Sequence, residues 1–323
     1  MIFQRSIFHS IRQAIRKALL FSLTRILPSS FLLDKRHFKI WEKRGYHITP
    51  IHFYSPIPDT RELNNEVFER RSTLKGIKIN EKMQLELLAI FSKAYKVEYD
   101  RFSREKTLNP KDFYLENGAF GCVDAEILYS FVRYFKPKII YEVGSGFSTL
   151  LLAKAILQNK EDSPLTSCSL HSFDPYPGEM LKKSFPSLTR LVEKKVQDIP
   201  LGVFEELSQN DILFIDSTHV LKLGSDVQYE YLEILPSLKK GVIVHFHDIF
   251  LPAEYPQKWF QEDLSFWNEQ YLLQAFLEFN ESFEVIWMGH FMHLNHPAIL
   301  KEAFNSYDPY SVTPGSFWIR KTK

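Results

Sequence analysis

The chain has 323 residues, of which 45% are apolar and 15% aromatic, so it can bury a large core, and disorder over most of its length is excluded. Lys and Arg number 40 against 39 Asp and Glu, which argues against a nucleic-acid binder held by charge. Two cysteines, Cys122 and Cys168, cannot form a disulfide framework and have no zinc-binding spacing. We therefore expect a reduced, cytoplasmic compartment.

Basic charge is concentrated at the N-terminus, which we define as an arm over residues 1–47. Residues 1–50 contain ten Lys and Arg but only Asp34 and Glu42, a net charge of +8. Apolar side chains recur at helical spacing over 5–27, with arginines on another side, which predicts a basic amphipathic helix. Such a helix can lie on the inner membrane surface, pack on its own domain or on a second subunit, or act as a transit peptide. No apolar run near this end approaches the roughly 20 residues that span a bilayer.

The next segment, 48–115, is predicted to be a linker followed by a helical cap. Three prolines between residues 50 and 58 favour an extended or turning chain. The apolar spacing over 80–98 predicts a helix. A single domain is expected over the remaining residues, 116–323.

Short β-rich runs alternate with helical stretches beyond residue 138. The expected strands are 139–143, 169–173, 190–193, 211–215, 241–246, 283–287 and 316–320. The expected helices are 124–135, 148–158, 178–185, 202–208, 226–237 and 266–279. This pattern predicts an α/β fold, namely a Rossmann-like, doubly wound, mostly parallel seven-stranded sheet with helices on both faces, preceded by an N-terminal helical extension.

The turn after the first strand contains Gly144, Ser145 and Gly146 and leads into an apolar helix. Two glycines let the backbone approach a ligand closely, and the free N–H groups at a helix start are available to it. A dinucleotide fingerprint would place a third glycine at Thr149, and its absence argues against an NAD(P)-dependent enzyme. A tight turn without a ligand is the alternative.

Acidic residues accompany three successive strands. Glu142 precedes the first glycine by two residues, Asp174 follows the second strand and Asp198 follows the third. Asp174 is placed to accept hydrogen bonds from ribose hydroxyls, and Asp198 to accept one from the adenine amino group. Either aspartate alone is more often a turn or cap residue, but the three together indicate a nucleoside site.

These motifs resemble those of class I S-adenosylmethionine-dependent methyltransferases, in particular the small-molecule O-methyltransferases. The similar segments, between about 120 and 320, are EVGSGFST, FDP, VQD, DILFIDSTH and GVIVHFHDIF. The resemblance implies that the cofactor is held at its methionine end by Glu142, Gly144, Ser145 and Gly146, at its ribose by Asp174 and at its adenine by Asp198. It also implies that Phe120 belongs to a lid segment, and it implies nothing about residues 1–115.

Asp216 and Asp248 follow the fourth and fifth strands, whose ends open on the same crevice in a parallel sheet. Their carboxylates can therefore converge on a hard cation. Metal-dependent O-methyltransferases hold Mg²⁺ with such a pair, and His247 as a third ligand would also suit another divalent cation. His219 stands where these enzymes carry their base, and its ordinary pKa near 6.5 suits that role, although a loop histidine held by hydrogen bonds is the alternative.

Other histidines and aromatic residues are expected to lie outside the chemistry. The three histidines at 290, 293 and 296 are expected in a loop between the last two strands, where acceptor contacts are common. The aromatic residues of 266–279 are expected to form core or a dimer surface. Strand alternation is expected to point His245 away from the metal ligands.

The sequence thus predicts an S-adenosylmethionine-dependent methyltransferase that acts on a hydroxyl of a small molecule or sugar-containing metabolite, assisted by a divalent cation such as Mg²⁺. The expected partners are the small-molecule acceptor, a membrane surface contacted through the arm, and a second copy of the chain, with no nucleic acid. The alternatives are an NAD(P)-dependent Rossmann oxidoreductase and a non-catalytic, membrane-associated scaffold. A scaffold would need none of the aspartates and histidines described above.

Overall fold

A computed structural model of the chain describes residues 15–19, 21–23, 25–183 and 185–323, and it divides into two compact units, Met1–Leu63 and Asn64–Lys323. The first unit contains α2 (Ser29–Leu32) and α3 (Lys35–Glu42). The helix predicted over 5–27 lies partly outside the described residues; within it, residues 15–19, 21–23 and 25–26 are helical and exposed. Among the described helices, none has the length and apolar character needed to cross a membrane.

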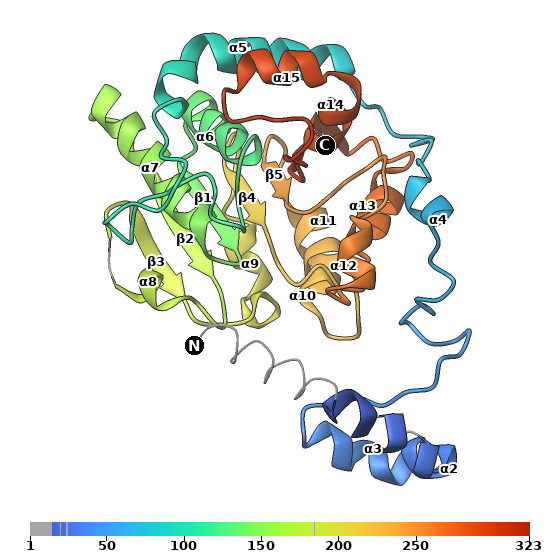
Figure 1. Cartoon of the computed structure of the whole chain (residues 1–323). Coiled ribbons are helices and arrows are strands. Elements are labelled where there is room, and N and C mark those ends of the chain that lie inside the picture. Colours follow the sequence, from blue (N-terminus) through green and yellow to red (C-terminus); the bar gives the residue numbers. More distant parts are fainter. Residues whose placement is uncertain (1–14, 20, 24, 184) are drawn as a thin grey trace, which may run out of the picture. The chain divides into compact units, whose positions relative to one another are not determined.

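The second unit is built around a seven-stranded sheet (Figure 1). Its strands are β1 (Ile139–Val143), β2 (Ser169–Phe173), β3 (Leu188–Val192), β4 (Ile212–Ile215), β5 (Ile243–Phe246), β6 (Phe283–Met288) and β7 (Phe317–Lys321). Their order is β3-β2-β1-β4-β5-β7-β6. Strands β1 to β5 are parallel, and β7 is antiparallel to both of its neighbours. All seven predicted strands are confirmed, and the order reverses between β1 and β4, where such sheets form a ligand-binding crevice.

Burial explains why the sequence predicts the central strands. Every residue of β4 and β5 is buried, because helices cover the sheet and neither surface meets water. Such strands therefore appear as continuous apolar runs rather than as alternating ones. The core also includes β7, where the ring of Phe131 stacks on the ring of Trp318 with centroids 4.0 Å apart.

The helices fall into groups that pack on the sheet. They are α4 (Asn65–Glu69), α5 (Glu81–Tyr99), α6 (Asp124–Phe135), α7 (Phe147–Asp162), α8 (Glu179–Lys182), α9 (Leu201–Phe204), α10 (Asp226–Tyr229), α11 (Leu235–Ser237), α12 (Gln257–Gln261), α13 (Glu269–Leu277), α14 (Gly289–Asn295) and α15 (Pro297–Ala303), with a 3₁₀ turn η1 (Val196–Asp198) and a π-helical segment η2 (Glu230–Ile234). Helices α5, α6 and α7 pack together, while η2 packs with α9, α10 and α11, so that both faces of the sheet are covered (Figure 1).

Several predicted helices differ from the observed ones. The segments predicted at 178–185 and 202–208 contain only single helical turns, and the one at 226–237 is interrupted by the π-helical segment. The helix predicted at 266–279 begins at Glu269, since Asn268 has a non-helical backbone. Phe266 and Trp267 consequently lie in the loop before that helix.

The prediction of a loop around the three C-terminal histidines is wrong. Residues Gly289–Asn295 form α14, and Pro297 begins α15 instead of closing a loop. Proline is favoured in the first turn of a helix, where its missing N–H is not needed. The three-residue spacing of His290 and His293 is therefore the spacing of one helix face.

Candidate active site

Gly144 closes the turn after β1 against the end of β4. Its φ is +82°, and a Cβ atom at this position would lie 1.9 Å from the backbone oxygen of Asp216. Its N–H donates to the backbone oxygen of Phe173 at the end of β2. Only glycine fits, because both the φ angle and the space exclude a side chain. Gly146 does not line the neighbouring cavity and has open space around it.

Glu142 supports this turn from inside the protein. Its carboxylate is fully buried and accepts hydrogen bonds from the hydroxyls of Ser148 (2.8 Å), Thr149 (2.8 Å) and Ser172 (2.5 Å). Burial raises the pKa of Glu142 to about 7, against the effect of these three donors. Since Glu142 does not line the cavity, the structure places it behind the turn.

A cavity of about 510 Å³ lies at the carboxyl ends of β1, β2 and β4, and Gly144, Ser145, Asp174 and Asp216 line it. One carboxylate oxygen of Asp174 accepts from the backbone N–H (3.1 Å) and the hydroxyl (2.6 Å) of Ser145. The other accepts from the backbone N–H of Tyr176 at 2.7 Å. These bonds fix the carboxylate and leave it able to accept from a ligand hydroxyl. The volume is in the range of small-molecule sites.

Two other residues assigned to the cofactor are not part of this lining. Asp198 ends η1 and is exposed, whereas Val196 and Gln197 of the same turn line the cavity. Phe120 is 2% exposed and packs its ring 4.9 Å from that of His247. The tight turn explains the first difference, because it rotates successive side chains to different sides.

Three side chains come together where β4 and β5 end. Ligand atoms of Asp216, His219 and Asp248 all lie within 4.8 Å of one another. His219 Nε2 is 3.4 Å from Asp216 Oδ1 and 3.6 Å from Asp248 Oδ2. Both His219 (φ +59°) and Asp248 (φ +56°) have left-handed backbones, which non-glycine residues adopt at a cost and mostly at functional sites.

His247, the residue directly after β5, reaches the same cluster. Its Nδ1 lies 3.5 Å from Asp216 Oδ1 and 3.7 Å from Asp248 Oδ2. Its Nε2 lies 3.8 Å from Asp124 Oδ2, and that carboxylate also accepts from the backbone N–H groups of Gly315 (2.8 Å) and Ser316 (3.0 Å). Burial would lower the pKa of His247, but the charges of Asp248 and Asp216 raise it well above its usual value.

Glu269 is a member of the site that sequence reasoning missed. Its buried carboxylate lies 2.8 Å from His219 Nδ1 and accepts from the hydroxyl of Tyr231 at 3.0 Å. Burial would lower the pKa of His219, but its contacts with Asp216 and Glu269 raise it to about 10. No local motif marks Glu269, which is 50 residues away in the chain.

The orientation predicted for His245 is wrong. Residues two apart in a strand share a face, and the rings of His245 and His247 stack with centroids 6.0 Å apart. His245 is nonetheless outside the cluster, since its Nε2 is hydrogen-bonded to Ser316 Oγ (3.0 Å) and its ring stacks on Phe214.

The cluster fits a divalent cation. Ligands of Mg²⁺ at roughly 2.1 Å lie no more than about 4.2 Å apart across the ion, close to the separations seen here. Two carboxylates with an imidazole nitrogen also suit Mn²⁺, Fe²⁺ or Zn²⁺. Burial would raise the pKa of Asp216, but His247 and His219 hold it well below its usual value, so that carboxylate is ionised.

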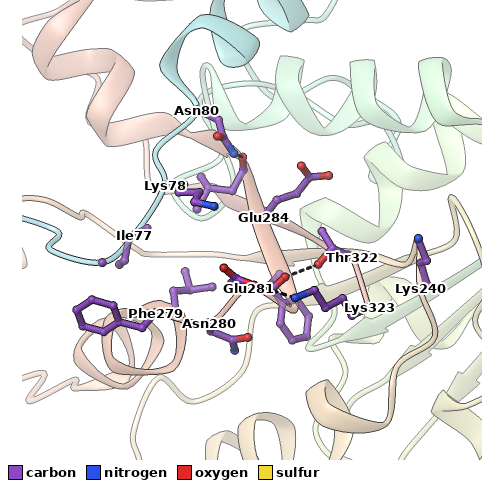
Figure 2. Close-up of a pocket in the computed structure, with 14 residues that line it drawn as sticks. Ile77, Lys78, Asn80, Lys240, Phe279, Asn280, Glu281, Glu284, Thr322 and Lys323 are labelled. Carbon is purple, nitrogen blue, oxygen red and sulfur yellow. Dashed lines mark hydrogen bonds and ion pairs between the residues drawn. The ribbon is translucent and has the colours of Figure 1, made fainter.

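A larger cavity, of about 1000 Å³, lies at the opposite edge of the sheet, beside β6 and the C-terminus (Figure 2). Two of its charged groups form an ion pair. Lys323 Nζ donates to Glu281 at 2.9 Å, and the Thr322 hydroxyl donates to the backbone oxygen of Glu281 at 2.7 Å (Figure 2). Among the described residues, its lining contains no Cys, His or Asp, so we assign the chemistry to the carboxyl ends of the strands.

Residues 141–249 match a family model described as a methyltransferase domain. An uncharacterized protein of Archaeoglobus fulgidus is 29% identical over 216 residues, which cover 64% of this chain and 88% of that protein. The match identifies residues 141–249 as a methyltransferase domain, and the strand order and the cavity at the β1–β4 crevice agree with the class I, S-adenosylmethionine-dependent type. The predictions of fold class and of enzyme class are confirmed.

Solved structures with this type of fold are only distantly similar. The MycE methyltransferase of mycinamycin biosynthesis, determined with Mg, SAH and mycinamycin VI, is 10% identical, with a TM-score of 0.35, over 64% of this chain and 52% of that one. This chain thus spans about half the length of MycE. CalS11, a TDP-rhamnose 3′-O-methyltransferase of calicheamicin biosynthesis, is 14% identical, with a TM-score of 0.38, over 80% of this chain and 98% of that one.

Proposed function

We propose that this methyltransferase methylates a hydroxyl oxygen of a small molecule with the assistance of a divalent cation. The observation that carries the proposal is the position of Asp216, which lines the cofactor cavity and also belongs to the cluster with His219 and Asp248. A hydroxyl held at this cluster would lie next to the cofactor. S-adenosylmethionine supplies a methyl group that needs no activation, whereas an alcohol is a poor nucleophile until its proton leaves.

Different residues of the site would bind the cofactor, hold the cation and accept the proton. Asp174 would accept the ribose hydroxyls, and Gly144 and Ser145 would lie against the rest of the cofactor. Asp216 and Asp248, with His247 rather than His219 as the third ligand, would hold the cation, which would lower the pKa of a bound hydroxyl. His219 would take the hydroxyl proton as the oxygen–carbon bond forms and the carbon–sulfur bond breaks, leaving S-adenosylhomocysteine.

The high pKa of His219 makes the cation necessary for this base role. With its pKa raised to about 10 by Asp216 and Glu269, the imidazole is protonated at neutral pH and cannot accept a proton. That protonation would be opposed by the positive charge of a cation held by Asp216 and Asp248. Glu269 would keep Nε2 directed at the cluster, since it binds the other ring nitrogen at 2.8 Å.

The experiment is transfer from ¹³C-methyl-labelled S-adenosylmethionine to phenols and pyranosides in the presence of Mg²⁺, with the new methoxyl signals followed by NMR. Excess chelator should stop transfer while binding of S-adenosylhomocysteine continues. His219→Ala should lower kcat by roughly 10² to 10⁴, the usual effect of losing a general base. Transfer that survives both the chelator and the substitution would contradict the cation and the base.

We also propose that the N-terminal unit contacts anionic membranes, as peripheral attachment of a cytoplasmic enzyme. Its described part exposes large apolar side chains, including Ile26 (74%), Phe53 (82%) and Tyr54 (84%). These side chains occur beside the net charge of +8 over residues 1–50. Apolar anchors combined with basic charge favour an anionic lipid surface.

Flotation with vesicles tests this attachment. The full chain should float with phosphatidylserine-containing vesicles at low salt and remain below with phosphatidylcholine vesicles. A chain lacking residues 1–63 should stay below in both cases, with its affinity for S-adenosylhomocysteine unchanged. If the full chain never floats, the exposed side chains serve as a contact between subunits, and self-association measured by ultracentrifugation should then depend on residues 1–63.

A further inference from the structure

Aromatic side chains form a continuous wall beside the acidic cluster. The ring of Trp267 lies 4.4 Å from that of His219, and Trp259 lies 4.8 Å from Trp267 at an angle of 67°. Phe250 continues the wall 5.2 Å from Trp259, and His290 lies 5.5 Å from Phe250. We call Trp267, Trp259, Phe250 and His290 the aromatic wall.

The two tryptophans are held firmly but remain partly exposed. The backbone oxygen of His219 accepts from the N–H groups of Asn268 (3.1 Å) and Glu269 (3.2 Å), which fixes the chain directly after Trp267. The N–H of Ser265 donates to the backbone oxygen of Trp259 at 2.7 Å. Phe250 is buried, whereas Trp259 and Trp267 are each partly exposed. Partly exposed aromatic faces on a fixed backbone are suited to stacking.

The far end of the wall carries an unsatisfied polar atom. His290 is only 7% exposed, and its Nδ1 has no hydrogen-bond partner. A Cβ atom placed on the neighbouring Gly289 would lie 3.4 Å from Oδ1 of Asp124. This end of the wall therefore also lies near the carboxylate that contacts His247.

We propose that Trp267 and Trp259 are the acceptor platform and that the acceptor is a ring compound that carries a hydroxyl group. One hydroxyl reaches Asp216 and Asp248, whose side chains are 29% and 19% exposed, while a ring face lies on the tryptophans. A phenolic ring and a pyranose share this chemistry, because each presents a flat or C–H-lined face together with hydroxyls. The inference rests on the proposed function, since it names the acceptor of that same site.

Binding tests the platform without requiring turnover. The full chain, saturated with S-adenosylhomocysteine and Mg²⁺, is titrated with catechol, with methyl β-glucopyranoside and with glycerol as an acyclic control, and saturation-transfer NMR reports the contacting protons. We expect at least one ring probe to bind through its ring protons, and glycerol not to bind. Trp267→Leu and Trp259→Leu should each weaken that ring probe about tenfold, the usual order for a lost stacking contact.

Matched variants separate stacking from folding. Trp267→Phe keeps a ring and should retain affinity within about threefold. Phe279→Leu removes a ring that is 75% exposed in the cavity at the opposite edge of the sheet (Figure 2) and should change nothing. S-adenosylhomocysteine affinity, measured by calorimetry for every variant, shows whether the fold and the cofactor site persist. The platform is overturned if neither ring probe binds the wild-type chain, or if both leucine variants bind the ring probe as well as the wild type does. Failure of the wild-type chain to bind S-adenosylhomocysteine would instead overturn the proposed function.

Discussion

Glu126 makes the stability of this protein depend on pH in a predictable direction. It lies in the first turn of α6, is 2% exposed, and accepts hydrogen bonds from the backbone N–H of Val123 (2.6 Å) and from the hydroxyl of Ser306. Burial raises the pKa of Glu126 from 4.5 to about 7. The folded protein therefore binds this proton more tightly than the unfolded chain does, and the stability that the proton confers is lost as the pH rises from 4.5 through 7.

Glu126→Gln should remove that dependence while keeping both contacts, because the amide oxygen can accept from Val123 and the amide NH₂ can donate to Ser306. At 1.36 kcal/mol per pKa unit, a pKa of about 7 against 4.5 corresponds to about 3.4 kcal/mol of lost stability over the whole titration. About 2.5 kcal/mol of this is lost between pH 5 and pH 8, because part of the loss occurs below pH 5. The free energy of unfolding of the variant, relative to wild type, should thus rise by about that amount over this interval.

The assay is urea unfolding followed by tryptophan fluorescence at pH 5 and pH 8, with the exposed Glu302→Gln as control. Groups other than Glu126 titrate in both proteins and cancel in the comparison. If the difference between wild type and Glu126→Gln is the same at both pH values to within about 0.5 kcal/mol, Glu126 ionises normally in the folded state, and our reading of its burial is wrong.

Three further substitutions test the cofactor site and the cation site. Gly144→Ala should lower the free energy of unfolding by about 2 kcal/mol or more, because the φ is +82° and the new Cβ would lie 1.9 Å from the backbone oxygen of Asp216. Gly146→Ala should have little effect, because the space around Gly146 is open. Equal effects of the two substitutions would refute the role of the turn. Asp174→Ala should weaken S-adenosylhomocysteine binding by about 1 to 3 kcal/mol in calorimetry, and the exposed Asp198→Ala should not; the reverse ranking would restore the prediction made for Asp198. Asp248→Asn should reduce Mn²⁺ affinity about tenfold or more, measured by paramagnetic relaxation, with cofactor affinity retained; unchanged Mn²⁺ affinity would remove Asp248 from the cation site.

Much of the cofactor half of the site could be predicted from the sequence, because it depends on strand ends. Parallel strands bring their carboxyl ends to one edge, so Asp174, Asp216 and Asp248 had to lie near the crevice once the strands were known. The requirement for glycine at 144 was also readable. The physical cause of this requirement, the backbone of Asp216, could not be predicted, since Gly144 and Asp216 are 72 residues apart in the chain.

The sequence could not predict how individual side chains satisfy their polar groups. Glu142 was expected to face the cofactor, but three hydroxyls draw its carboxylate behind the turn. Glu269 reaches His219 from a helix start, and Trp267 reaches it from a loop, and neither segment carries a motif. Such contacts depend on tertiary packing, which periodicity does not encode.

The most direct test of the central claim is calorimetric titration of the full chain with S-adenosylhomocysteine and, separately, with NAD. The account predicts saturable binding of S-adenosylhomocysteine with one site per chain, weakened by Asp174→Ala, and no binding of NAD, because the turn after β1 carries no third glycine at Thr149. Binding of NAD with no heat from S-adenosylhomocysteine would contradict it.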